Sequence, residues 1–177
     1  MMQTSLEGIA KKAQREKKHR FQNLYGMINH NLLAYSWTQL KRNAASGVDK
    51  VSYSDYEENV SEKIGELCER LKEKKYRTKL VRRQYIPKGD GKMRPLGIPA
   101  IEDKLIQHAA MLLLQGIYEQ DFLPCMYGYR PARGARDAVL DLRNTLQDGK
   151  YRFIVEADIK GFFDNISHEW LIKMLEQ

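Results

Sequence analysis

The sequence predicts an α+β fold, in which a series of helices is interrupted by one β-hairpin and followed by a single strand and helix. Three observations support this class. Apolar residues recur at helical spacing before residue 75 and again between residues 100 and 148. A Gly-Asp-Gly turn separates two short extended segments, and consecutive apolar residues near residue 154 have the pattern of a buried strand.

The composition is that of a globular protein with one domain or one and a half. The chain has 177 residues, of which 42% are hydrophobic and 30% charged. It contains no apolar run long enough to span a membrane, and its first residues lack the apolar core of a secretory signal. Cys68 and Cys125 are far apart, which predicts two free thiols in or near the core and a reducing, cytoplasmic compartment.

The charge is strongly asymmetric along the chain. Residues 1–100 carry 21 Lys and Arg against 11 Asp and Glu, whereas residues 101–177 carry 9 against 12. Residues 70–94 alone hold 11 basic residues and only two acidic ones. This pattern favours a nucleic-acid-binding front joined to a part that holds cations, the alternative being a solvated basic face without a partner.

The first two elements are predicted to be helices. The stretch up to about Arg20 is strongly basic and has few apolar residues, so we expect a helix that needs a partner or frays. A more apolar helix follows over 29–43. The basic residues of the first helix that we expect to bind nucleic acid are Lys11, Lys12, Arg15, Lys17 and Lys18.

The clearest helical pattern covers residues 54–75. Ser54 and Glu57 have the spacing of a capping box, which would start the helix. One apolar stripe then follows at helical spacing, and a stripe of this kind predicts core packing rather than a cofactor site. Its members are Tyr56, Val60, Ile64, Leu67 and Leu71.

Residues 78–99 predict a basic β-hairpin around the Gly89-Asp90-Gly91 turn. Pro87 and Pro95 make both segments edge strands, because proline cannot donate to a sheet. Lys88 and Arg94 lie on opposite arms, where two cations could hold a triphosphate. The alternative is an exposed turn whose charges discourage aggregation.

The second half of the chain predicts two helices, a strand and a last helix. The helices cover 100–118 and 134–148, and Gly149 has the position of a helix-terminating residue. His108 falls on the apolar side of the first of them and is predicted to be a core histidine with its hydrogen bonds satisfied. The segment 151–159 predicts a buried central strand, and Ser167 caps the final helix.

Asp158 stands at the end of this predicted strand, and Asp164 follows six residues later. Open α/β sheets bind ligands at the carboxyl ends of their strands, and a carboxylate there can hold a hard cation such as Mg²⁺. On pattern alone, an aspartate that caps the following turn is the favoured interpretation of Asp158, ahead of metal binding.

Four stretches together resemble one family. GVDKVSYSDYEENV (47–60), RRQYIPKGDGKMRPLGIPAIEDKLIQHA (82–109), YGYRPARGARDAV (127–139) and ADIKGFFDNISHEWL (157–171) are similar, in this order, to the reverse transcriptases encoded by bacterial group II introns. The resemblance covers roughly residues 40–177. It implies a right-hand polymerase, of which the chain holds a basic helical N-terminal extension (1–45), the fingers (46–120) and the start of the palm (121–177).

The resemblance also implies roles for individual residues. Asp158 matches the first catalytic aspartate, a ligand of two Mg²⁺ ions, and the backbone carbonyl of Ile159 would be a further ligand. Phe163 matches the aromatic gate that excludes a ribose 2′-hydroxyl group. Lys88 and Arg94 match the residues that clamp the incoming deoxynucleoside triphosphate. The remaining basic positions expected on RNA phosphates are Lys74, Lys75, Arg82 and Arg83.

The family's second metal-binding motif, an aromatic-x-Asp-Asp turn, is missing from the 177 residues, as is the thumb. We therefore expect that this polypeptide alone does not polymerise DNA and that it pairs, if at all, as a homodimer. The implied partners of the intact protein are group II intron RNA, an RNA template with a DNA primer, and deoxynucleoside triphosphates. An RNA-binding, maturase-type splicing module and a retron or diversity-element reverse transcriptase remain as alternatives.

Overall fold

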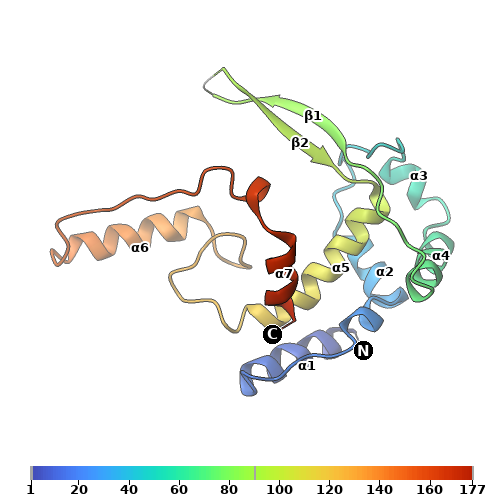
Figure 1. The fold of residues 1–177 in the computed structure, drawn as a ribbon, viewed down its shortest axis with the longest axis horizontal. Helices are drawn as coiled ribbons and strands as arrows, with labels where there is room; N and C mark the ends of the chain where they lie inside the picture. The colour runs from blue at the N-terminus through green and yellow to red at the C-terminus, as the bar shows by residue number, and fades with distance from the viewer. Residues whose placement is uncertain (1, 90, 177) are drawn as a thin grey trace.

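The computed structural model describes residues 2–89 and 91–176 and has the expected α+β composition (Figure 1). Helices predominate, and the two strands form one antiparallel sheet. The elements in chain order are α1 (Met2–Arg15), η1 (Leu24–Met27), α2 (His30–Gln39), α3 (Tyr53–Glu57), α4 (Val60–Lys72), β1 (Arg82–Pro87), β2 (Met93–Ile98), α5 (Ile101–Tyr118), α6 (Ala135–Gln147), η2 (Phe163–Asn165) and α7 (His168–Leu175).

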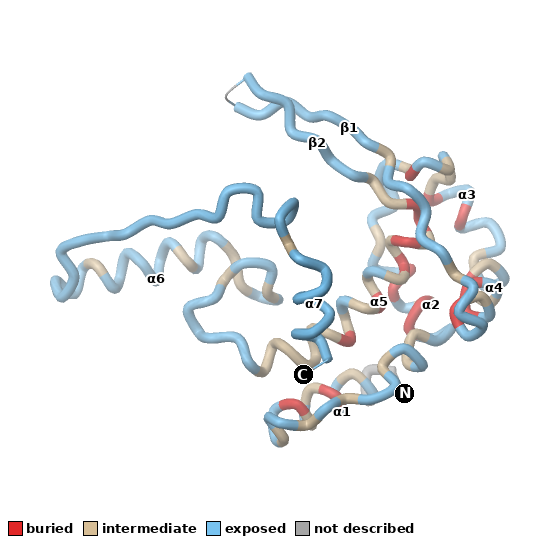
Figure 2. Tube along the Cα trace, viewed as in Figure 1, coloured by how far each residue is buried: buried red, intermediate tan, exposed pale blue. Residues whose placement is uncertain are grey.

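The hydrophobic core lies in the N-terminal two thirds of the chain, around α5. Both α1 and α2 pack against α5, and α4 packs against α2. Leu33, Leu67 and Leu105 are completely buried where these helices meet. Figure 2 shows the buried residues concentrated on α2, α4 and α5, whereas the chain beyond residue 121 is mostly exposed. The first two thirds therefore form the packed body of the molecule.

The basic helix α1 has the partner that its composition requires. Ile9 and Ala13, one turn apart, are buried against the core, and α1 runs along α5. The helix ends at Arg15 rather than near Arg20, because the chain turns there with the His19 amide donating to the Glu16 carbonyl. Packing on α5 thus holds a helix that would fray in isolation.

The prediction of one helix over 54–75 was wrong in two respects. The segment forms two helices, α3 and α4, separated by Asn59 in the left-handed conformation (φ 58°), which asparagine tolerates better than most residues. The capping box is formed by Ser52 and Asp55, not by Ser54 and Glu57. The Ser52 amide donates to the Asp55 carboxylate at 2.9 Å, and the Asp55 amide donates to Ser52 Oγ at 3.2 Å.

The β-hairpin is confirmed, and its register is defined. Pro87 lies opposite Met93 at the tip, and Arg82 lies opposite Ile98 at the base. Gly91 adopts φ +76°, the conformation that a tight turn requires of glycine. Asp90 lies outside the described residues. Both strands are edge strands, as their prolines predict, because the sheet has only these two.

The base of the hairpin is fastened to the helical body by side chains of opposite charge and by backbone groups. Asp103, at the start of α5, accepts hydrogen bonds from the Tyr76 hydroxyl (2.5 Å) and the Lys79 amide (3.2 Å). The Lys79 ammonium reaches Asp49 at 3.0 Å, and Arg82 Nε donates to the Ser46 carbonyl at 3.0 Å. The hairpin thus projects from a fixed root (Figure 1).

The loop after α2 passes so close to α5 that only glycine fits at one position. A Cβ atom on Gly47 would lie 2.6 Å from the Cα and nitrogen atoms of Ala100. Since both neighbours are backbone atoms, a larger residue there would displace the start of α5. Gly47 therefore sets the spacing between this loop and the residue before Ile101.

The predicted buried strand over 151–159 is not formed. The segment has no regular structure, and its apolar side chains, Phe153 and Val155 among them, are almost completely exposed. A strand satisfies its backbone only by pairing with another strand, and the only two strands of the described chain pair with each other. The helices on either side were predicted correctly, with Gly149 at φ +68° after α6 and Ser167 accepting from the Trp170 amide before α7.

Two predictions about single residues need correction. Cys68 is buried as expected, but Cys125 is exposed, because it lies in the turn-rich segment after α5 that packs on little else. His108 lies on α5 as predicted, yet its buried Nδ1 atom has no hydrogen-bond partner. Within residues 2–89 and 91–176, no helix combines the length and apolarity needed to cross a membrane.

Candidate functional site

The hairpin brings Lys88 and Arg94 to the same face of the sheet. Arg94 lies directly opposite Ile86, and Lys88 is two residues beyond Ile86 in the same strand direction. Because side chains alternate along a strand, Lys88 and Arg94 share one face as diagonal neighbours, a relation in which Cα atoms lie roughly 7–8 Å apart. Both residues are exposed, so two cations stand open to solvent at the tip.

The turn that carries Lys88 is closed by backbone hydrogen bonds. The Lys88 amide donates to the Lys92 carbonyl at 2.7 Å, and the Gly91 amide donates to the Lys88 carbonyl at 3.0 Å. These bonds extend the ladder by one pair beyond Pro87 and Met93. The position of the Lys88 backbone is therefore fixed relative to Arg94, while its side chain extends into solvent.

The predicted metal and gate residues lie together in the segment before α7. Asp158 and Ile159 belong to the exposed stretch without regular structure, and Phe163 begins η2. Gly161 turns the chain between them at φ +63°, and Asn165 Nδ2 donates to the Gly161 carbonyl at 2.8 Å. Lys88 and Arg94 belong to the hairpin, whereas Asp158 belongs to the irregular segment between α6 and η2 (Figure 1).

The residues around Asp158 do not make a complete metal site. Mg²⁺ takes about six oxygen ligands, usually one or two carboxylates together with waters and substrate phosphates. The described part of the chain holds no group of three or more histidine, cysteine, aspartate or glutamate side chains placed to share a metal ion. Asp158 is thus a single candidate ligand in the described residues rather than part of such a group, and no chemical step follows from it here.

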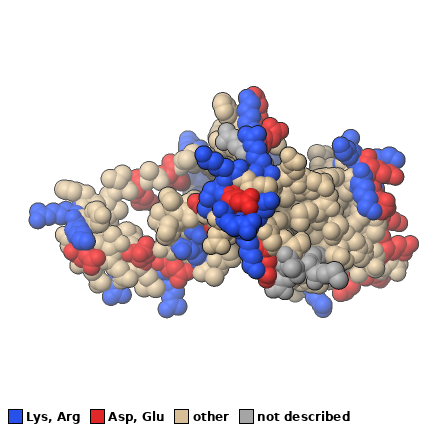
Figure 3. Space-filling view, turned by 90° about the horizontal axis from the view of Figure 1, so that it is seen from below, with Lys and Arg blue, Asp and Glu red and all other residues tan. Residues whose placement is uncertain are grey.

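Several of the predicted RNA-binding residues of the first helix have partners within the protein. Glu16 pairs with Arg15 at 2.9 Å and Lys12 at 3.9 Å, and the bond from Arg15 holds the pKa of its carboxyl below the usual value. Lys17 pairs with Asp121 at 2.9 Å and donates to the Gln120 carbonyl. Figure 3, seen from the side of α1, shows basic side chains surrounding a small acidic group. The exposed side chains of Lys11 and Lys18 complete the predicted set.

The basic residues between α4 and β1 likewise include some that are bonded within the protein and some that are exposed. Lys75 pairs with Glu73 at 2.8 Å, and Arg82 is held by the Ser46 carbonyl. Lys74 ends α4 in the left-handed conformation (φ 56°), and its amide donates to the Leu71 carbonyl. Arg83 is exposed on the opposite face of β1 from Arg82. Lys74 and Arg83 are both exposed.

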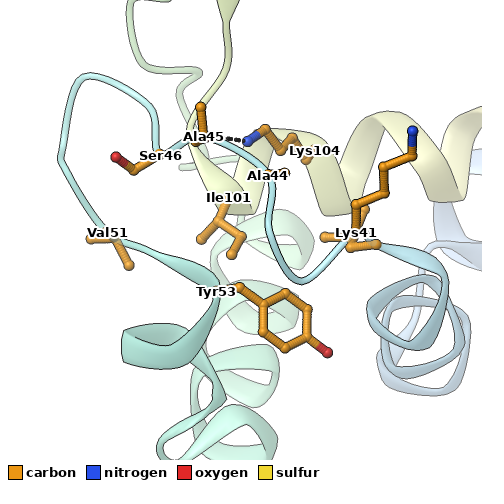
Figure 4. Close-up of a pocket in the computed structure, with 9 residues that line it drawn as sticks. Lys41, Ala44, Ala45, Ser46, Val51, Tyr53, Ile101 and Lys104 are labelled. Atoms are coloured by element: carbon orange, nitrogen blue, oxygen red, sulfur yellow. Dashed lines mark hydrogen bonds between the residues drawn. The ribbon is translucent and has the colours of Figure 1, made fainter.

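The sequence reasoning missed one cation near the root of the hairpin. Lys104 on α5 donates to the Ala45 carbonyl at 2.6 Å, and it lines a cavity of about 30 Å³ with Lys41 and Tyr53 (Figure 4). Burial lowers the pKa of the Lys104 ammonium. Its helical position among apolar residues gave no signal, because only the fold brings it to the loop at residues 44–46.

Comparison with known proteins identifies the family. The sequence model described as reverse transcriptase (RNA-dependent DNA polymerase) matches residues 86–177, which is more than half of the chain. The chain belongs to the reverse transcriptase family. The match begins inside β1, so it includes Lys88, Arg94, Asp158 and Phe163. Reverse transcriptases as a family use a divalent metal ion.

Relatives of this reverse transcriptase chain include proteins encoded within introns. Group II intron-encoded protein LtrA of Lactococcus lactis subsp. cremoris is 36% identical over 172 residues, which is 96% of this chain and 28% of LtrA. Protein YkfC of Escherichia coli K12 is 34% identical over 134 residues, or 74% of this chain and 35% of YkfC. An uncharacterised 91 kDa protein of the cob intron of Schizosaccharomyces pombe is 28% identical over 86% of this chain and 19% of its own length. The chain thus spans about a third or less of these relatives.

Proposed function

We propose that this chain is the fingers and the start of the palm of a group II intron reverse transcriptase. In the whole protein it binds intron RNA and a primed RNA template and takes part in adding deoxynucleotides. The similarity to an intron-encoded protein over nearly the full chain supports this type over the retron and diversity-element alternatives. The boundaries at residues 45 and 120 are part of the proposal, as is a bacterial cytoplasm, where intron RNA is made.

The placement of Lys88 and Arg94 on one face of the hairpin carries the proposal. Two cations at fixed separation match the spread-out negative charge of a triphosphate, and both occupy the positions that correspond to the family's nucleotide clamp. Lysine supplies a mobile point charge, and arginine a planar group that can hold two oxygens at once. The closed turn keeps the two in register, so binding would not have to order the backbone.

The catalytic side of the proposal rests on Asp158, Ile159 and Phe163. We assign Asp158 and the Ile159 carbonyl as ligands of the divalent ion, which we take to be Mg²⁺, and Phe163 as the gate that selects deoxynucleotides. Their order and spacing match the family motif within the region that the family model covers. Phe163 packs edge-on against Phe162 with ring centroids 5.3 Å apart, a contact that would support the gate.

A second function, RNA binding without catalysis, is favoured by a different observation. The basic excess lies in the first 100 residues, whereas the candidate metal ligand lies in an exposed segment without regular structure. The body could hold structured intron RNA by itself, as a maturase-type module does. The whole protein can have both functions. For the 177 residues alone, the two functions predict different results, because RNA binding does not require DNA synthesis.

The experiment that separates the two functions uses the 177-residue chain. Binding to group II intron RNA is measured at two salt concentrations, and primer extension is assayed on the same sample. Salt-sensitive binding without extension is the expected result, because the 177 residues contain one of the metal-binding motifs. Absence of binding at low salt would contradict the proposal, and extension would show that one carboxylate motif is sufficient.

The first prediction concerns Asp158 in the whole reverse transcriptase. Replacing Asp158→Asn removes a negative ligand without changing the size of the side chain, so we expect DNA synthesis to fall by at least about 10³-fold, the scale of losing a directly stabilising group. RNA affinity should change less than about twofold, since Asp158 is not among the basic residues that we expect to bind RNA phosphates. Asp164→Asn is the matched control. Retained synthesis in the Asp158 variant would remove the metal assignment.

A further inference from the structure

A groove separate from the hairpin lies on the body of the molecule, where η1, the end of α4 and the segment 74–78 meet. It has a volume of about 630 Å³. Its lining combines two tyrosines, two cations, two small polar side chains and two aliphatic ones. These are Tyr25, Tyr76, Lys74, Arg77, Asn23, Thr78, Leu71 and Ile106.

Tyr25 is anchored in this groove but not covered. Its hydroxyl donates to the Leu71 carbonyl at 2.6 Å, which satisfies a carbonyl at the end of α4. Nevertheless 48% of the residue remains exposed. Because its hydroxyl is already bonded to the protein, the ring is the part of this side chain that can take a stacked ligand. The ring is therefore held in one orientation and is available for a planar ligand.

Two cations line the groove together with the ring. The Lys74 side chain is exposed at the end of α4, and Arg77 Nη1 donates to the carbonyls of Lys74 (3.0 Å) and Tyr76 (2.8 Å). These bonds hold the Arg77 guanidinium beside the Lys74 backbone. Both use the Nη1 atom, so Nε and Nη2 of Arg77 do not take part in them. The acidic neighbour, Glu73, is already paired with Lys75. The groove thus has a net positive rim.

The floor of the groove suits an aromatic ligand. Leu71 and Ile106 supply apolar surface, and Tyr76 contributes a second ring whose hydroxyl is bonded to Asp103. Burial and the bond to Asp103 raise the pKa of Tyr76, so the groove gains no negative charge at neutral pH. A ligand with a planar, partly apolar body and an attached negative group fits both the floor and the rim.

We propose that this groove binds an unpaired base of single-stranded RNA, with the base stacked on Tyr25 and an adjacent phosphate between Lys74 and Arg77. The inference rests on the proposed RNA-binding function and names the form of RNA that this surface takes. Base stacking on an aromatic ring combined with phosphate contacts is the usual basis of single-strand binding. Duplex RNA is excluded, because its bases are stacked on both sides and cannot reach the ring.

The test compares the 177-residue chain with its Tyr25→Leu variant in binding to a short oligouridine, by fluorescence anisotropy. We expect the variant to bind about tenfold more weakly, the scale of removing one base–tyrosine stack. The slope of affinity against salt should stay unchanged, because the ring neutralises no phosphate. Tyr35→Leu is the matched control, since Tyr35 is similarly exposed (42%) on α2 outside the groove, and it should bind like the parent chain.

A second variant and a cross-linking experiment guard against a folding artefact. Tyr25→Phe loses the bond to Leu71 and keeps the ring, so it should retain most of the affinity. With the unchanged chain, thiouridine-substituted oligouridine should cross-link to Tyr25 under light, and a duplex of the same length should not. A Tyr25→Leu variant that binds as well as the parent, or cross-links confined to other residues, would overturn the inference while leaving the proposed function intact. Failure of every RNA to bind would instead contradict the proposed function.

Discussion

Asp103 shows how one buried carboxylate can hold two parts of a molecule together. It is 3% exposed at the start of α5, yet both of its oxygens accept hydrogen bonds, one from the Tyr76 hydroxyl and one from the Lys79 amide. Its position in the first turn of a helix is also favourable for a negative charge. The carboxylate therefore joins α5 to the chain that enters the hairpin.

We predict that Asp103→Ala lowers the free energy of unfolding by about 1–3 kcal/mol, because it leaves the Tyr76 hydroxyl and the Lys79 amide without an acceptor. Urea unfolding followed by circular dichroism measures the change. Asp121→Ala is the control, since its ion pair with Lys17 is exposed and should contribute less than about 1 kcal/mol. Equal effects of the two substitutions would show that Asp103 is not a structural anchor.

His108 is a residue at which burial should make stability depend on pH. Burial lowers the pKa of its imidazole from the ordinary value of 6.5, and its Nδ1 atom has no partner. The unfolded chain therefore binds a proton at a higher pH than the folded chain does. The stabilising contribution of the neutral ring is present above about pH 6.5 and is lost as the pH falls below that value.

The corresponding prediction is that unfolding midpoints decline between pH 7 and pH 5, and that His108→Gln makes this decline shallower. The glutamine side chain does not titrate, so it removes the proton uptake that favours unfolding. Exposed His30 provides the control substitution, His30→Gln, which should leave the decline as it is in the parent chain. An unchanged decline in the His108 variant would be inconsistent with a buried neutral imidazole.

At the scale of elements, the parts predicted correctly are those whose signals are local. The hairpin follows from its Gly-rich turn and prolines, and α5 follows from an apolar pattern that needs no knowledge of its neighbours. The α+β class follows from the same two features. The placement of Lys88 and Arg94 on opposite arms was also predictable, although the shared face became apparent only with the register.

The elements that were predicted wrongly depend on contacts with other parts of the chain. Whether 151–159 forms a strand depends on a pairing partner, which a local apolar run cannot reveal. The sequence around residue 54 offers two serine–acid pairs at capping-box spacing, and the choice of Ser52 and Asp55 depends on how Tyr53 and Tyr56 enter the core against Trp37. Tyr53 stacks on Trp37 at 4.0 Å, which fixes where the helix can begin.

The segment joining α4 to β1 should contribute salt-dependent RNA affinity. We predict that replacing Lys74, Lys75, Arg82 and Arg83 together with alanine weakens binding to intron RNA and flattens its dependence on salt. Each phosphate that is no longer neutralised should reduce the slope by about one. The matched control replaces Arg136, Arg143, Lys150 and Arg152, four basic residues from the second half of the chain. Identical slopes for the two variants would mean that the first cluster is only a solvated face.

At the scale of the whole molecule, charge and apolar exposure are divided between the two halves. The basic excess lies on the packed body, and the second half exposes a set of large apolar side chains, which we call the C-terminal apolar surface. Large exposed apolar side chains in this number are typical of an interaction surface. Its members include Val139, Leu142, Phe153, Val155, Trp170 and Met174.

We predict that the 177-residue chain self-associates through the C-terminal apolar surface, in line with the proposed homodimer. Sedimentation velocity should show concentration-dependent association in the micromolar range, and Leu142→Glu should weaken it by about tenfold or more. Leu80→Glu, at an exposed leucine outside this surface, is the control and should leave association unchanged. A monomer at all concentrations would exclude the proposed pairing.

The candidate site was only partly predictable at this scale. The identities of Asp158, Phe163, Lys88 and Arg94 follow from motifs, which are matters of order and spacing. Their arrangement in space does not, because the chain between α6 and η2 is exposed and has no regular structure. Tyr25 and Lys104 carry no motif, so only the fold reveals that they line a groove or hold a loop.

The hairpin is attached to the body at its root, and its tip projects away from the body (Figure 1). Its two strands pair with each other, and Asp103, Asp49 and Ser46 hold the root through Lys79 and Arg82. Six residues of strand reach ~20 Å, so a small rotation at the root sweeps Lys88 through a much larger arc. The affinity of the tip cations for a ligand is consequently adjustable from a distance, by side chains in the body that never touch that ligand.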